Sequence, residues 1–250
     1  MSIRQRTRGV GPAQTAGLED GTPPDAPAVV ADHRQPPLRA ALAVVIVSGV
    51  LLAGLGVFVV TRGGGGNSIQ IVHPAGLDGV LQTPAMPKPD FTLTDTSGRP
   101  FDLQAQTAGD ATLLYFGYTH CPDICPTHMA DIALGLAKQP ASVRAHIKVV
   151  FVTTDPARDT PAVLRNWLDS FNSTFIGLTG SNAQIDAAEA SVGMPPATVE
   201  PLGNGNYSVD HAAWVIAFTP DNLAHAIYPS GLDSPAVWAH DMPRLVKWRG

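Results

Sequence analysis

The chain has one long apolar stretch near its beginning and, after residue 90, a series of short apolar runs separated by polar turns. Residues 111–116 (ATLLYF) and 147–152 (IKVVFV) are two such runs, and both are rich in strand-forming residues. Short apolar runs without polar alternation are typical of strands buried on both faces, so we expect central strands here. A helix is predicted between them, from about Cys125 to Lys138, because its apolar positions have helical spacing: Met129, Ile132, Ala133 and Leu136.

The remaining elements follow from alternation, capping residues and turns. Alternating positions around the turn Thr96–Gly98 predict a β-hairpin over residues 91–103. Asp159 or Thr160 can cap a helix whose first residue is Pro161. The other predicted elements are a strand at 175–178, a helix at 181–192 capped by Ser181, a loop at 194–206, a hairpin of 215–218 with 224–228, and a last helix at 234–248, in which Pro243 favours a kink.

Strands that alternate with helices favour parallel strand pairs. The order of elements therefore predicts an α/β fold with a mixed central sheet and helices on both faces. Two cysteines follow the strand at 111–116, and the second of them begins the next helix. A cysteine pair between a central strand and a helix is the thioredoxin arrangement, so we expect a thioredoxin-like domain over residues 85–250.

The long apolar stretch lies in a separate N-terminal region. No charged side chain occurs between residues 40 and 61, and a membrane-spanning helix needs about 20 apolar residues. We expect a disordered tail at 1–37, an uncleaved transmembrane helix at 38–61 and a flexible tether at 62–84, with an extended arm from Pro74 to Pro89. Arg34 and Arg39 precede the span, which favours a cytoplasmic N-terminus and an extracytoplasmic domain held at the cell membrane by a single pass.

The charge distribution limits the class of partner. Hydrophobic residues make up 44% of the chain and charged residues 15%. Residues 1–62 have a formal charge of +2 and residues 63–250 a formal charge of −7. An acidic domain without basic clusters argues against nucleic acid, because phosphate binding needs a cationic face.

The candidate chemistry lies in Cys121 and Cys125, which are the only two cysteines of the chain. If Cys125 begins a helix and Cys121 lies in the loop before it, both sulfurs can face one point near the helix N-terminus, where thiolate is stabilised. Thiolates suit Cu(I), and two neighbouring thiols can also form a disulfide. The pattern alone supports a metal site or a redox pair.

Two sulfurs leave copper short of ligands, so one of the eight histidines is expected to be the third. His211 follows an extended segment at an expected strand end. His128 lies one turn beyond Cys125 and could also reach a metal, although its position favours the surface. The other histidines are expected away from the site: His33 in the tail, His73 in the tether, His120 turned away from Cys121, His146 and His240 facing solvent, and His225 in the last hairpin.

Three segments resemble the motifs of the Sco/SenC family, in the family's order. They are residues 115–126 (YFGYTHCPDICP), 154–161 (TDPARDTP) and 209–211 (VDH). The resemblance covers about residues 85–250, and a single N-terminal anchor is usual in this family. The loop at 194–206 departs from the family's tyrosine-rich, basic segment, which bears on partner recognition rather than on the metal site.

The resemblance implies a thioredoxin-like copper protein that holds Cu(I) or Cu(II). It implies that Cys121 and Cys125 are thiolate ligands and a redox-active pair, that His211 is the third ligand, and that Asp155 is a secondary residue near the site. The family delivers copper to the dinuclear copper centre of cytochrome c oxidase subunit II, or reduces thiols there. The resemblance also implies other partners, which are copper chaperones or thiol oxidoreductases.

Three hypotheses follow from these residues. The first is a copper metallochaperone with a Cys2His site, which is not an enzyme in the usual sense. The second is a thiol-disulfide oxidoreductase or redox sensor, which needs Cys121 and Cys125 but not His211. The third, a peroxide-reducing enzyme, needs an arginine beside a reactive thiol, and Arg158 is the only arginine inside a site motif.

Overall fold

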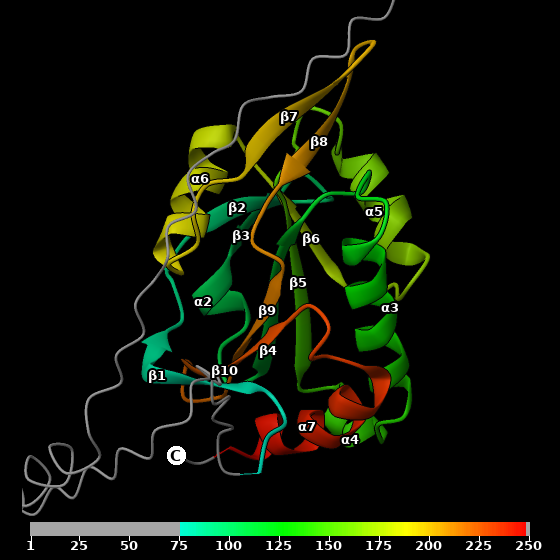
Figure 1. The fold of residues 1–250 in the computed structure, drawn as a ribbon. Helices are drawn as coiled ribbons and strands as arrows, with labels where there is room; N and C mark the ends of the chain where they lie inside the picture. The colour runs from blue at the N-terminus through cyan, green and yellow to red at the C-terminus, as the bar shows by residue number, and fades with distance from the viewer. Residues whose placement is uncertain (1–75, 249–250) are drawn as a thin grey trace, which may run out of the picture. The chain divides into compact units, whose positions relative to one another are not determined.

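The computed structural model describes residues 76–248, and strands alternate with helices along this part of the chain (Figure 1). The strands are β1 (Val80–Pro87), β2 (Thr92–Asp95), β3 (Pro100–Asp102), β4 (Ala111–Gly117), β5 (Ile147–Thr153), β6 (Ile176–Thr179), β7 (Thr198–Gly203), β8 (Asn206–Asp210), β9 (Trp214–Phe218) and β10 (Leu223–Pro229). The helices are α2 (Leu103–Gln106), α3 (Ile124–Ala137), α4 (Ala141–Arg144), α5 (Pro161–Asp169), α6 (Asn182–Ser191) and α7 (Pro235–Lys247).

Eight of these strands form one mixed sheet in the order β1-β10-β9-β4-β5-β6-β2-β3. The central strands β4, β5 and β6 are parallel, and the outer pairs are antiparallel. This arrangement confirms the predicted central strands and the mixed α/β sheet. Because β4 and β5 are parallel and in register up to Gly117 and Thr153, their carboxyl ends lie side by side at one edge of the sheet. The segments that follow these two strands therefore start from neighbouring points.

Both faces of the sheet carry a hydrophobic core, and β4 contributes to both. Leu113 and Tyr115 belong to the core that α3, α5 and α7 cover, whereas Leu114 and Phe116 belong to the core that α2 and α6 cover. All seven residues of β4 are buried, as expected for a parallel strand covered on both sides. Figure 1 shows α3 and α5 on one side of the sheet and α2 and α6 on the other. Burial on both faces fixes the strand from which the cysteine segment begins.

The predicted loop at 194–206 is wrong, because most of it is the hairpin of β7 and β8. The two strands pair in a separate two-stranded sheet, and the hairpin extends away from the main sheet (Figure 1). Every residue of β7 is exposed, so the segment lacks the hydrophobic alternation that indicates a strand. The missed signal was Gly203-Asn204-Gly205, in which all three residues have positive φ and make the turn.

Half of the predicted extended arm from Pro74 to Pro89 is a strand paired within the main sheet rather than an arm leading into the domain. Residues 80–87 form β1, an edge strand of the main sheet that pairs with β10. Pro84 and Pro87 are tolerated there because an edge strand leaves one row of N–H groups without a ladder partner. The predicted tail, the membrane span and the tether up to residue 75 lie outside the described residues. Within residues 76–248, no helix is long and apolar enough to cross a membrane.

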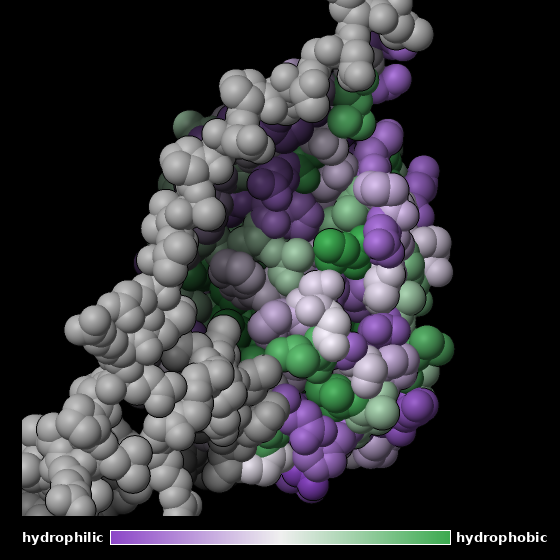
Figure 2. Space-filling view, viewed as in Figure 1, coloured by the Kyte–Doolittle hydropathy of each residue, from purple (hydrophilic) through white to green (hydrophobic). Residues whose placement is uncertain are grey.

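Exposed apolar side chains on the described domain are scattered. On the face shown in Figure 2, hydrophobic residues lie in small separate groups between hydrophilic ones. The most exposed large apolar side chains are Val199 and Leu202 of the β7–β8 hairpin, at 59% and 69%. Isolated exposed residues of this kind are normal on a folded domain.

We predict that Gly135→Ala destabilises the domain, although alanine favours a helix over glycine by about 1 kcal/mol. A Cβ at Gly135 would lie 2.3 Å from Cβ of the buried Trp238, at the contact between α3 and α7. We expect unfolding in urea to show a net loss of about 1–3 kcal/mol. Leu134→Ala, at a side chain that is 54% exposed on the same helix, is the control and should change stability by less than about 0.5 kcal/mol. Unchanged stability in Gly135→Ala would contradict this close helix contact.

Candidate metal centre

The two cysteines lie where β4 passes into α3, as the sequence predicts. Cys121 is half-buried in the connecting loop, and Cys125 is completely buried in the first turn of α3. The backbone N–H of Cys125 donates a hydrogen bond to Sγ of Cys121 over 3.4 Å, and both thiols are free. The N-terminus of a helix presents unpaired N–H groups, which stabilise negative charge on sulfur.

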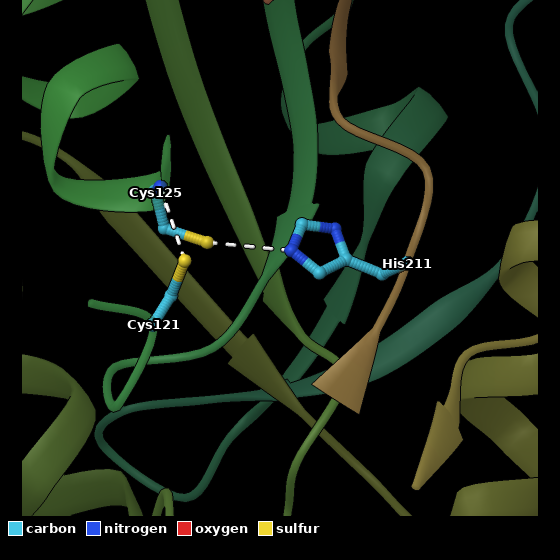
Figure 3. A group of neighbouring side chains, drawn as sticks. All are labelled: Cys121, Cys125 and His211. Carbon is cyan, nitrogen blue, oxygen red and sulfur yellow. Dashed lines mark hydrogen bonds between the residues drawn. The ribbon is translucent and has the colours of Figure 1, made fainter. Parts of the chain in front are cut away.

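His211 reaches the cysteines from a distant part of the chain. It follows β8 directly, and its Nε2 lies 3.5 Å from Sγ of Cys125 (Figure 3). Its Nδ1 lies 3.2 Å from the carbonyl oxygen of Ala212, which can only accept a hydrogen bond. Nδ1 therefore carries the proton in that contact, and the lone pair of Nε2 faces the sulfurs. This tautomer is the one that an imidazole needs to bind a metal through Nε2.

The three ligand atoms form a compact group. The two sulfurs and the nearest ring nitrogen of His211 all lie within 4.8 Å of one another. A pocket of about 210 Å³ opens beside them, and Tyr118, Pro122 and Ile124 contribute to its lining. Two sulfurs and one imidazole nitrogen are the donor set that suits a soft or borderline metal such as copper. The structure thus brings together the three residues that the family resemblance implies as ligands, at a point that solvent can reach.

The two thiols differ in their electrostatic environment. A hydrogen bond from the Cys125 thiol lowers the pKa of Cys121 to about 3, and hydrogen bonds from the backbone N–H groups of Cys125 and Asp123 also lower it. Donation of that proton to Cys121, together with burial, raises the pKa of Cys125 above its ordinary value. The metal-free pair therefore shares one proton, and the negative charge is on the more exposed sulfur.

The predicted surface position of His128 is wrong. Its side chain is only 2% exposed, and Nδ1 lies 2.5 Å from Oδ2 of Asp233. The helical pattern of α3 does not show this burial, because a distant segment covers the polar side of the helix. That segment contains Asp233 and lies just before α7. His120 is turned away from the cysteines, as expected, and contacts the Thr119 hydroxyl at 3.1 Å. The side chain of His146 is 58% exposed and faces solvent, also as expected.

Asp155 lies outside the ligand group but helps to place it. Its Oδ1 accepts a hydrogen bond from the Tyr207 hydroxyl at 2.9 Å, and its Oδ2 pairs with Arg158. The guanidinium of Arg158 also stacks on the Tyr207 ring at 3.6 Å and donates to the Tyr207 carbonyl oxygen. Tyr207 belongs to β8, the strand that leads into His211. This cluster therefore attaches the β7–β8 hairpin to the segment after β5. His211 follows this hairpin directly.

A second group of ligand-type side chains, Asp78, His240 and Asp241, also occurs in the described part of the chain. Oδ2 of the buried Asp241 already accepts hydrogen bonds from the backbone N–H of Asp78 and the hydroxyl of Tyr228. Its Oδ1 contacts Nδ1 of His240 at 2.6 Å. These hydrogen bonds attach the start of the domain to α7, and they account for the cluster without a metal.

The fold and the site together define a thioredoxin-like α/β domain with a dithiol and a histidine at one point of its surface. A sequence model of the SCO1/SenC family matches residues 81–247. The chain therefore belongs to the SCO1/SenC family.

Individual relatives agree with this assignment. The mitochondrial protein SCO2 of Saccharomyces cerevisiae is 35% identical over 134 residues, which are 52% of this chain and 44% of that protein. The structure of Bradyrhizobium japonicum ScoI with copper bound is 33% identical, with a TM-score of 0.58, and the match covers 64% of this chain and 99% of that one. Yeast Sco1 with copper bound is 27% identical, with a TM-score of 0.59 and coverage of 67% and 91%. The similarity to yeast SCO2 thus spans less than half of that protein.

We predict that Cys121 of the metal-free, reduced protein reacts as a thiolate at unusually low pH. Its pKa of about 3 lies below the ordinary thiol value, so the thiolate is present at any pH above about 3. Alkylation of Cys121 by iodoacetamide, followed by mass spectrometry, should change by less than about twofold between about pH 5 and pH 8. A thiol of ordinary pKa would accelerate several hundredfold over roughly the same range. An increase of that size at Cys121 would contradict the shared-proton pair.

Proposed function

We propose that this protein binds one copper ion through Cys121, Cys125 and His211 and delivers it to the dinuclear copper centre of cytochrome c oxidase subunit II. The observation that carries the proposal is the approach of two sulfurs and one imidazole nitrogen to within 4.8 Å, from two distant segments of the chain. The copper-bound structures of B. japonicum ScoI and yeast Sco1 support copper as the metal. Subunit II as the recipient follows from the family's role.

The donor set suits an ion that is carried and then released. Thiolates favour Cu(I), and the imidazole of His211 is a good ligand for Cu(II) as well, so the site can hold either oxidation state. Three protein ligands leave one side of the ion free, and the pocket beside Cys121 gives access to it. A ligand of the recipient protein can bind there first and then replace the three residues one at a time. The copper ion is the cargo, and its transfer needs no net oxidation or reduction.

Membrane attachment is part of the proposal. The uncharged apolar stretch at 40–61 supports a transmembrane anchor that holds the domain on the extracytoplasmic side of the cell membrane. An anchored domain meets membrane-bound oxidase subunits at high effective concentration. Other copper chaperones or thiol oxidoreductases would then load or reduce the site from the same compartment.

A thiol-disulfide oxidoreductase is the second candidate, and the charge on Cys121 favours it. A thiolate with a pKa of about 3 beside a second thiol can attack a disulfide and be released by the neighbouring sulfur. This activity needs both cysteines but not His211. The peroxide-reducing alternative needs a free arginine at the thiol, and Arg158 is engaged with Asp155 and Tyr207 instead.

We predict that Cys121→Ala, Cys125→Ala and His211→Ala each weaken copper binding by at least about a hundredfold, because each removes one of three ligands. Copper titration, monitored by the sulfur-to-Cu(II) charge-transfer absorbance, should show one ion per chain in the wild type and loss of the band in each variant. His146→Ala removes an exposed histidine far from the thiols and is the control, with unchanged binding expected. Full affinity in either cysteine variant would contradict the site.

The same variants separate the two candidate functions. In a disulfide reduction assay, metal-free His211→Ala should have the same activity as the metal-free wild type, because this reaction does not need His211. Copper transfer to the soluble domain of an oxidase subunit II should be lost in the same variant. If His211→Ala transfers copper normally, delivery through a Cys2His site is excluded.

A further inference from the structure

Beneath the metal centre lies a buried tyrosine whose hydroxyl contacts a ligand atom. Tyr115 is on the central strand β4, is completely buried, and donates a hydrogen bond from its hydroxyl to Sγ of Cys125 at 3.5 Å. A phenol keeps its proton at neutral pH, so the hydroxyl is available as a donor to the sulfur.

Close packing fixes the position of this donor. A Cβ at Gly117 would lie 2.7 Å from Cε1 of Tyr115 and 2.9 Å from Sγ of Cys125, so only glycine leaves room for the ring and the sulfur to meet. Three other rings surround the Tyr115 ring: the ring centroid of His128 is 4.8 Å away, that of Phe151 is 5.8 Å away and that of His211 is 6.1 Å away. A large side chain enclosed in this way has no alternative rotamer without repacking the core.

His128 is itself held by a buried carboxylate. The side chains of His128 and Asp233 are 2% and 5% exposed, and the pair joins α3 to the segment before α7. Nε2 of His128 is buried without a hydrogen-bond partner among the described residues. Leaving a buried polar atom unpaired costs about 1–3 kcal/mol, which an apolar side chain at this position would avoid. The pair lies against the ring of Tyr115, whose hydroxyl donates to Cys125.

We propose that the Tyr115 hydroxyl tunes the Cys125 sulfur by this hydrogen bond, and that the His128–Asp233 pair is a positioning pair that holds the Tyr115 ring in place. The proposal deepens the copper function and rests on it. A hydrogen bond to a thiolate ligand withdraws electron density from the sulfur and weakens its donation to Cu(II) more than to Cu(I). Tyr115 thereby shifts the site towards Cu(I). In the metal-free protein, the same bond favours the dithiol over the disulfide, because a disulfide sulfur is the poorer acceptor.

The test is Tyr115→Phe in the full chain, purified in a mild detergent, because this change removes only the hydroxyl. We expect one copper per chain, a charge-transfer band moved to longer wavelength, and a ratio of Cu(II) to Cu(I) affinity raised about five- to tenfold. Tyr228→Phe is the matched control: Tyr228 is also completely buried, and its hydroxyl donates to Asp241 at 2.7 Å, away from the thiols. It should leave both copper readouts unchanged. A wild-type band and affinity ratio in Tyr115→Phe would overturn the proposal.

A copper-free measurement separates failure of this inference from failure of the copper function. The proteins are equilibrated with mixtures of reduced and oxidised dithiothreitol, which exchange two hydrogens with the Cys121–Cys125 pair, and the disulfide fraction is measured by alkylation. We expect Tyr115→Phe to raise the ratio of disulfide to dithiol severalfold over wild type and Tyr228→Phe. If wild type binds no copper, the delivery proposal fails, and this ratio alone decides the role of Tyr115. An unchanged ratio then overturns that role.

The positioning pair is tested by substitutions at Asp233. Asp233→Asn keeps an acceptor for Nδ1 of His128 and should behave as wild type in band position and affinity ratio. Asp233→Ala releases the imidazole and should reproduce part of the Tyr115→Phe shift. Added to Tyr115→Phe, Asp233→Ala should produce no further shift, because the hydroxyl through which it acts is absent. A wild-type band in Asp233→Ala would remove the pair from the proposal, and an additive shift in the double variant would show that it acts by another route.

Discussion

The site depends on one constraint, which is that Nε2 of His211 must lie 3.5 Å from the sulfur of Cys125 although 86 positions separate the two residues. Packing of β4 on both faces and the start of α3 fix the cysteines. The histidine depends on β8, which is attached to the rest of the domain through the buried side chain of Val209 and through the stacking and pairing of Arg158, Asp155 and Tyr207. The position of the third ligand therefore depends on both the apolar and the polar attachment of this hairpin.

The cysteine half of the site was predictable from the sequence because its causes are local. An apolar run, two thiols at helical spacing and Pro126 in the first turn are all visible in one segment, and β4 and α3 confirm them. From the sequence pattern alone, His211 was only one candidate for the third copper ligand. Its strand β8 alternates polar and apolar residues over only five positions, and the partner strand β7 is fully exposed and shows no alternation. The family resemblance, rather than periodicity, singled out that histidine.

One wrong prediction, for His128, and one feature that the sequence did not show, for Tyr115, have related physical causes. His128 was expected at the surface because the helix that carries it is polar on that side, and only the tertiary structure shows that the segment with Asp233 covers it. The role of Tyr115 was equally hidden, since a tyrosine in a buried apolar run is predicted simply as core. Its hydroxyl matters because the close approach at Gly117 places it beside Cys125. In each case a contact between distant segments, and not a local propensity, gives the side chain its chemistry.

In the proposed site, one copper ion has two sulfur ligands and one nitrogen ligand, all from this chain. X-ray absorption spectroscopy of the copper-loaded protein at the copper K-edge measures these ligands directly. We expect scattering from two sulfurs and one imidazole nitrogen in the wild type, and loss of the imidazole contribution in His211→Ala. A copper site with sulfur ligands alone, or an imidazole contribution that persists in His211→Ala, would contradict the Cys2His site.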